Sequence, residues 1–145
     1  MIKPAVLAVA LVMGTSAVIA ATDAIKERQA LMKQQSAATK EPGAMLKGEA
    51  PFDLAKVKKA LAVYVETGKK FPTLFPDDTK TGGDTAASPK IWEDMAGFKA
   101  AATKLEHDAE TAAAEIKDEA SFKAHFPQVL KNCGSCHETY RLKKS

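Results

Sequence analysis

The sequence has 145 residues, of which 46% are hydrophobic and 27% are charged, and its formal net charge is +3. This composition excludes a disordered chain and favours one domain, and the small, scattered excess of positive charge argues against a nucleic-acid-binding protein. Two cysteines are too few for a disulfide-stabilised scaffold. Abundant alanine, together with few aromatic and β-branched residues, predicts an all-α protein.

Residues 1–20 are expected to be a secretory signal peptide rather than part of the fold. A single charge at Lys3 precedes an apolar run over residues 4–12, and residues 18–20 provide a cleavage pattern before Ala21. A membrane anchor is the alternative use of this stretch. The mature chain, residues 21–145, contains no later segment apolar enough to cross a bilayer. We therefore expect a protein outside the cytoplasm, which in a Gram-negative bacterium means the periplasm.

Two helices are predicted in the first half of the mature chain. The first begins at Thr22 or Asp23, since either is a suitable N-cap, and runs to about Thr39. The Glu-Pro-Gly sequence at residues 41–43 interrupts it or bends the chain. The second helix opens at Pro51, carries one apolar stripe at positions 54, 57, 61 and 64, and ends at residues 71–72. A long irregular stretch over residues 72–88 follows.

Two further helices complete the prediction. Ser88 and Pro89 are the expected N-cap and first residue of the third helix, whose apolar residues alternate spacings of four and three from Ile91 to Ile116. Asp118 caps the fourth helix, and Pro127 should kink it or delay its regular part. The fourth helix has the same spacing at positions 122, 126, 129, 133, 136 and 140. These patterns predict an antiparallel four-helix bundle.

Residues 133–137 read Cys-Gly-Ser-Cys-His, which is the attachment signature of a c-type haem. Two thiols three residues apart on one helical face can each add to a vinyl group at the same edge of a porphyrin. His137, directly after the second cysteine, then supplies the proximal iron ligand. The motif predicts one covalent haem c held by Cys133 and Cys136.

Three other uses of these cysteines are weaker. A thioredoxin-like redox pair belongs at the start of a helix in a strand-rich fold, and no strands are predicted here. A zinc site needs two further ligands, and the remaining histidines, His107 and His125, are not in a paired motif. A disulfide between Cys133 and Cys136 would strain a helix. We expect His107 to be exposed and His125 to be at the surface or partly buried.

A haem motif close to the C-terminus, on the last helix of a bundle, resembles the class II c-type cytochromes, the cytochrome c-prime family. The resemblance covers the whole mature chain and rests on residues 133–141 and on the Arg-Gln-Ala-Leu-Met-Lys segment at residues 28–33. Residues 51–53, 74–76 and 88–92 look most like the low-spin branch, the cytochrome c-556 kind. The resemblance implies an electron carrier with redox partner proteins. No second titratable cluster accompanies the motif, so we expect no enzyme.

The sixth iron position separates two functions. A side chain there makes a low-spin electron carrier, and an open position makes a protein that binds nitric oxide or carbon monoxide. Met32 shares the inward face of the first helix with Ile25 and Arg28, and the resemblance to the low-spin branch implies that its thioether ligates iron. The alternative is that Met32 only covers the distal face. Met45 and Met95 are weaker candidates, and Met95 is expected in the core.

Two arginines are candidate partners of the haem propionates. Arg28 lies on the predicted haem-facing side of the first helix, and the alternative is a solvated surface arginine. Arg141 lies one turn after His137, and the family resemblance implies a structural or propionate contact. Many relatives in the wider family are dimers through the first two helices, but no convincing second apolar stripe is present here. A homodimer therefore remains an open alternative.

Overall fold

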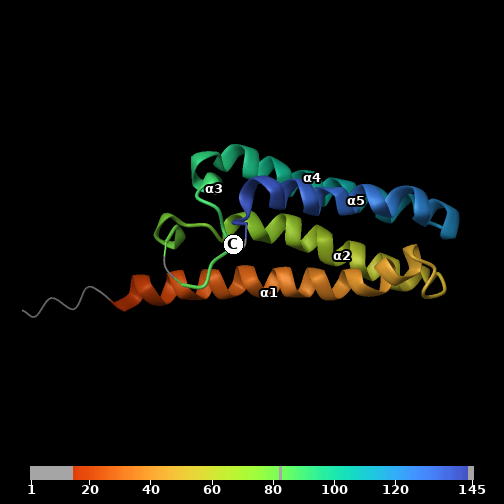
Figure 1. The fold of residues 1–145 in the computed structure, drawn as a ribbon, viewed down its shortest axis with the longest axis horizontal. Helices are drawn as coiled ribbons and strands as arrows, with labels where there is room; N and C mark the ends of the chain where they lie inside the picture. Colours follow the sequence, from red (N-terminus) through yellow and green to blue (C-terminus); the bar gives the residue numbers. More distant parts are fainter. Residues whose placement is uncertain (1–14, 82, 144–145) are drawn as a thin grey trace, which may run out of the picture.

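The computed structural model describes residues 15–81 and 83–143. Within this part of the chain, four long helices lie side by side and antiparallel: α1 (Thr15–Leu46), α2 (Leu54–Lys70), α4 (Met95–Glu115) and α5 (Glu119–Tyr140) (Figure 1). The link between α2 and α4 holds the short helices η1 (Phe71–Thr73), η2 (Asp77–Thr79) and α3 (Lys90–Glu93). The predicted all-α, four-helix bundle is confirmed. Among the described residues, no helix has the length and apolarity needed to cross a membrane.

The predicted apolar stripes form the interior of the bundle. Most of them meet in a first core cluster, and a smaller second core cluster lies at the end of the bundle where α5 ends. The first cluster comprises Met45, Val57, Ala60, Leu61, Tyr64, Ala109, Ala112, Ile116, Phe122, Phe126 and Val129. The second comprises Phe75, Ile91, Phe98 and Tyr140. Burial of these side chains removes apolar surface from water and is the main force that holds the four helices together.

Helix α1 differs from the prediction at both ends. It begins at Thr15, so the predicted cleavage point after Ala20 falls within it, and residues 1–14 of the predicted signal peptide lie outside the described residues. At the other end, α1 continues through Pro42 to Leu46. Proline cannot donate the helical hydrogen bond, but Pro42 is buried and Met45 belongs to the first core cluster. This packing offsets the missing bond and keeps the last turn helical.

The predicted third helix is divided at Asp94, which separates α3 from α4. Its backbone leaves the helical region, with φ −133° and ψ 58°, and its carboxylate accepts a hydrogen bond of 3.0 Å from the Gly97 N–H. The same carboxylate accepts the Tyr140 hydroxyl at 3.0 Å. A short acidic side chain favours such a cap over a continuous helix, and here it also fixes the end of α5.

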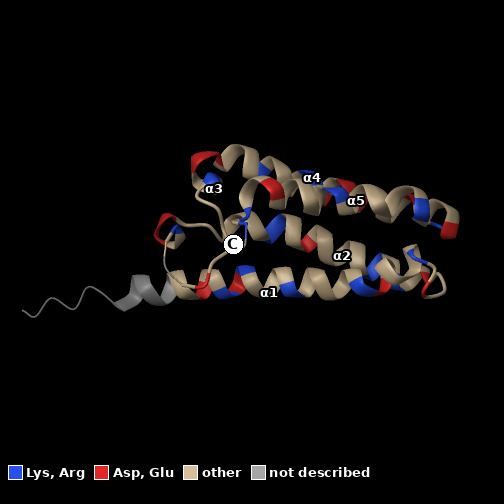
Figure 2. Cartoon of the chain, viewed as in Figure 1, with Lys and Arg blue, Asp and Glu red and all other residues tan. Residues whose placement is uncertain are grey.

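Helix α5 follows the prediction at its start and is unbroken along its length. The Asp118 carboxylate accepts the Ser121 N–H at 2.8 Å, and the Ser121 hydroxyl accepts the Asp118 N–H at 3.0 Å. This capping box confirms Asp118 as the N-cap. Pro127 lies inside the helix and does not delay its regular part. Acidic and basic residues occur along all the long helices rather than in one patch (Figure 2).

Candidate functional site

Cys133 and Cys136 lie on one side of α5, as their spacing predicts. Both residues are half-buried, whereas Gly134 and Ser135 between them are exposed. Cys136 packs against the second core cluster, and both thiols are free. Burial raises the pKa of both thiols, so each carries its proton at neutral pH. The motif therefore presents two protonated thiols toward the interior, in the arrangement that attachment to one flat group requires.

His137 follows directly on α5 and is exposed. Partial desolvation of the ring, and then the positive charge of Arg141, lower the pKa of His137. A lower pKa favours the neutral imidazole, which is the form that can donate an electron pair to a metal. His137 is therefore accessible and in the protonation state that ligation of iron needs.

Helix α1 places three candidate side chains on the face turned toward this segment. Arg28, Met32 and Gln35 follow one another at spacings of four and three residues, so they share one face of the helix. Arg28 is 5% exposed and Gln35 is 8% exposed, whereas Met32 between them is half-buried. The Gln35 Nε2 atom lies 3.7 Å from Cys133 Sγ and donates a hydrogen bond to it. This contact joins the face of α1 directly to the cysteine motif.

Arg28 is buried without a polar partner among the described residues. The Nε atom and both terminal nitrogens of its guanidinium are buried and make no hydrogen bond. The guanidinium carbon lies 4.4 Å from the centre of the Phe75 ring, and burial lowers the pKa of Arg28. A buried unpaired cation costs several kcal/mol, and a carboxylate is the group that satisfies a guanidinium best. The orphaned donors therefore fit a haem carrying propionate groups.

Arg141 has a different setting from Arg28, because it is exposed at the end of α5. Its backbone N–H donates to the His137 carbonyl at 3.3 Å, and the residue forms an isolated antiparallel bridge with Ala87. The neighbouring Leu142 N–H donates to the Ala86 carbonyl at 2.8 Å. These contacts connect the C-terminal end of α5 to the segment before α3. A contact between the Arg141 side chain and a propionate stays a prediction.

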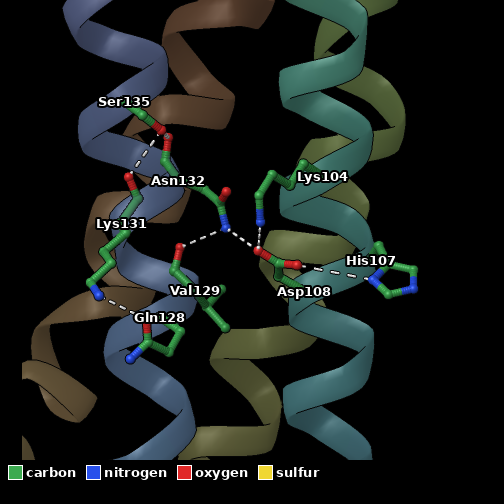
Figure 3. A network of polar contacts seen from close by, with 8 residues as sticks. All are labelled: Lys104, His107, Asp108, Gln128, Val129, Lys131, Asn132 and Ser135. Carbon is green, nitrogen blue, oxygen red and sulfur yellow. Dashed lines mark hydrogen bonds and ion pairs between the residues drawn. The ribbon is translucent and has the colours of Figure 1, made fainter.

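A polar network on the other side of α5 holds the helix against α4 (Figure 3). Asn132, directly before Cys133, is 7% exposed, and its Nδ2 atom donates to Asp108 Oδ2 at 2.7 Å and to the Val129 carbonyl at 3.2 Å. Lys104 Nζ lies 2.5 Å from the same Asp108 oxygen. Burial acts to raise the pKa of Asp108, but the hydrogen bonds from Lys104 and Asn132 outweigh it and the pKa is lowered. A charged acceptor therefore fixes the rotation of α5 next to the motif.

Gln35, Asn132 and Asp108 were not predicted as site residues. Glutamine and asparagine on an amphipathic helix are usually solvated, and the aspartate lies on a different helix from its partner. For Gln35 a signal was present, because it continues the spacing that joins Arg28 to Met32. For Asn132 the signal was a polar residue one turn after the buried Val129.

His107, His125 and Met95 lie where the sequence predicted. His107 is exposed, and the half-buried His125 has its Nδ1 atom 3.0 Å from Glu115 Oε2. Met45 belongs to the first core cluster, and Met95 packs against the second.

Comparisons with known proteins show which proteins this chain is similar to. A family model described as Cytochrome C' matches residues 23–141. The chain is 52% identical over 144 residues to a cytochrome c' of Rhodopseudomonas palustris, covering 99% of both chains. It is 44% identical over 118 residues to a cytochrome c-556 of Agrobacterium tumefaciens, covering 81% of this chain and 93% of that one.

Solved structures of such proteins have the same fold. The structure of cytochrome c' from Rhodopseudomonas palustris matches with a TM-score of 0.83 and 56% identity, covering 86% of this chain and 99% of that chain. A structural model of oxidised cytochrome c556 from the same organism matches with a TM-score of 0.78 and 36% identity, covering 85% of this chain and 98% of the other. The chain therefore belongs to the cytochrome c' family, whose cofactor is a covalently bound haem c.

Proposed function

We propose that the protein is a periplasmic one-electron carrier. In this proposal Cys133 and Cys136 form the two thioether bonds to haem c, and His137 and Met32 are the axial ligands of its iron. Arg28 pairs with a propionate. The haem supplies the redox chemistry, a change of one electron at iron, and the protein sets the potential and the access to solvent.

The register of Met32 on α1 is the observation that supports this function most. Met32 lies between Arg28, which needs an anion, and Gln35, whose amide reaches the Cys133 sulfur. Both neighbours are buried, while Met32 itself remains half-buried on the same face. With haem attached at Cys133 and Cys136 and His137 as the proximal ligand, a thioether in this register would be available as the second iron ligand.

A methionine ligand suits electron transfer for two reasons. The thioether is soft and uncharged, so it favours ferrous over ferric iron and raises the reduction potential relative to water or a harder ligand. It also ligates iron in both oxidation states, so little rearrangement accompanies each electron.

The carboxylate partner of Arg28 is stabilised in its ionised form by the adjacent cation, which keeps the charge near the haem constant.

The alternative function is a five-coordinate protein that binds nitric oxide or carbon monoxide. The observation in its favour is the relative with 52% identity over the whole chain, which is named cytochrome c', whereas two relatives named cytochrome c-556 have 44% and 37% identity. In that case Met32 would cover the distal face without binding iron.

Visible spectra of the purified holoprotein in both redox states separate the two functions. Six-coordinate iron gives sharp, separate α and β bands when reduced, and an open site gives one broad band. Met32→Leu keeps the volume of the side chain but removes sulfur, and should abolish the sharp bands and allow the reduced protein to bind carbon monoxide. Met95→Leu, the same change at a half-buried methionine beside the second core cluster, is the matched control and should leave the spectrum unchanged.

If the wild-type protein already binds carbon monoxide rapidly and Met32→Leu has no spectral effect, the electron-carrier assignment is wrong. The periplasmic location has a separate test. Cell fractionation should recover the holoprotein in the periplasmic fraction. Its mass should be that of a chain that begins at Ala21 and carries one haem.

A further inference from the structure

Gln35 is a buried, neutral side chain of α1 that the proposed ligand set does not use. Its Nε2 atom donates to Cys133 Sγ at 3.7 Å, so it bridges from α1 to α5. Sulfur is a weak acceptor, and a buried amide is not expected to point at it unless the surrounding packing leads it there.

The backbone carbonyl of Gln35 accepts a hydrogen bond from a side chain one turn further along α1. The Thr39 hydroxyl donates to the Gln35 carbonyl at 2.8 Å and lies 2.7 Å from the Tyr64 hydroxyl of α2. Tyr64 is fully buried, and burial raises the pKa of Tyr64 to about 12, so the phenol keeps its proton. A continuous series of polar contacts therefore runs from α2 through α1 to the first cysteine of the motif on α5.

This contact is suited to persist after the haem is attached. A free thiol can donate through S–H as well as accept, but a thioether sulfur has no hydrogen and can only accept. The Gln35 amide is the donor in this pair, so formation of the thioether bond at Cys133 removes nothing that the contact needs. Met32 lies three residues before Gln35 on the same face of α1.

We propose that Gln35 is a positioning residue for the haem: its amide bonds the Cys133 sulfur and so sets the position of α1 relative to the attachment segment. The part of this proposal that concerns Met32 rests on the proposed function. Because Cys133 would carry a thioether bond to the haem, the positive end of the amide N–H would lie near the haem edge, where it would favour the reduced form, which carries one more electron. Gln35 thus contributes to a higher reduction potential.

The test compares two holoproteins that differ at adjacent positions of α1. Gln35→Met keeps the length of the side chain and removes the donor, whereas Gln34→Met makes the same change at an exposed position. For Gln35→Met we expect a fall of about threefold in the ferrous-to-ferric ratio at a fixed solution potential, which is about 0.7 kcal/mol. Gln34→Met should match the wild type. Equal potentials for both variants would overturn the proposal.

A third variant separates positioning from a general loss of stability. Gly68→Ala crowds the contact between α2 and α4, where its new methyl group meets Glu106 and Ala102, and should lower the melting temperature without moving the potential. If Gly68→Ala shifts the potential as much as Gln35→Met does, the effect is not specific to Gln35 and the proposal fails.

A measurement on the wild-type protein keeps the proposal testable if Gln35→Met does not fold. The measurement uses a diamagnetic form of the reduced protein, which is the low-spin holoprotein itself or, if the sixth position is open, its carbon monoxide complex. In that form the Gln35 side-chain NH₂ should show ring-current-shifted resonances and slow exchange with solvent. Unshifted, rapidly exchanging resonances would contradict it. Failure of the proposed function gives a different result. A high-spin wild-type spectrum would contradict the electron-carrier function, but the shifted Gln35 resonances and the change in potential for Gln35→Met would still be expected.

Discussion

Replacing Arg28 with methionine tests whether an anion lies beside the buried guanidinium. Methionine keeps an unbranched apolar stem and removes the charge. Arg28 is 5% exposed, and its three nitrogens have no hydrogen-bond partner among the described residues. If a propionate pairs with it, Arg28→Met breaks a buried ion pair, and the free energy of unfolding of the holoprotein falls by about 3–5 kcal/mol.

The opposite sign is expected if no anion is present. Arg28→Met then removes an unsatisfied buried charge, which raises the free energy of unfolding by about 1–3 kcal/mol. The lost contact with the Phe75 ring, 4.4 Å away, reduces this gain in the free energy of unfolding by about 1 kcal/mol. The two cases therefore differ in direction as well as in size.

Unfolding of the holoproteins, followed by both circular dichroism and haem absorbance, measures this difference. A loss of about 3 kcal/mol lowers the melting temperature by about 10 °C in a domain of this size. Lys26→Met, at an exposed position of the same helix, is the control and should change stability by no more than about 0.5 kcal/mol. If Arg28→Met is as stable as the wild type, or more stable, the pairing with a propionate is refuted.

Three further predictions concern the attachment site, a helix cap and a close contact. Replacing both Cys133 and Cys136 with alanine should abolish covalent attachment, so that acid–acetone extraction removes all haem; haem retained in the protein would contradict this. Hydrogen bonds from the α4 backbone and then from the Tyr140 hydroxyl hold the pKa of Asp94 below its usual value. The ionised carboxylate therefore stabilises the fold above about pH 4, and this stabilisation is lost as the pH falls through the lower, folded-state pKa. Asp94→Asn should therefore reduce the acid sensitivity seen in melting curves below about pH 4, and an unchanged pH dependence would refute this. Gly68→Ala would put a methyl group 2.8 Å from the Glu106 Cβ atom and should cost about 1–3 kcal/mol; an unchanged melting temperature would show that the helices separate freely.

The helices of the bundle could be predicted because their signals are local. Alternating spacings of four and three residues depend only on the geometry of one helix, and most of these positions are buried and none is exposed. The Asp118 cap is equally local, because the side chain bonds a backbone group three residues away. Such features need no knowledge of the rest of the chain.

At two of the boundaries that differ from the prediction, tertiary packing overrides the local signal. Pro42 normally ends a helix, but burial of its own ring and of Met45 keeps α1 helical to Leu46. Asp94 sits within a regular apolar pattern, yet the hydroxyl of Tyr140 on another helix reinforces its cap and splits the predicted helix. In both cases the boundary depends on contacts with other helices, which are the first core cluster around Met45 and the Tyr140 hydroxyl at Asp94.

The sequence by itself determined the all-α bundle and the covalent haem chemistry, because stripe spacing and the Cys-Gly-Ser-Cys-His order are properties of one short segment. Only the tertiary structure decided that Arg28 is buried rather than solvated, and that Gln35 contacts Cys133, which is 98 residues away. These features depend on how α1 packs against distant parts of the chain. Small rotations of a helix about its axis move a side chain from solvent to the interior, and no local pattern records that rotation.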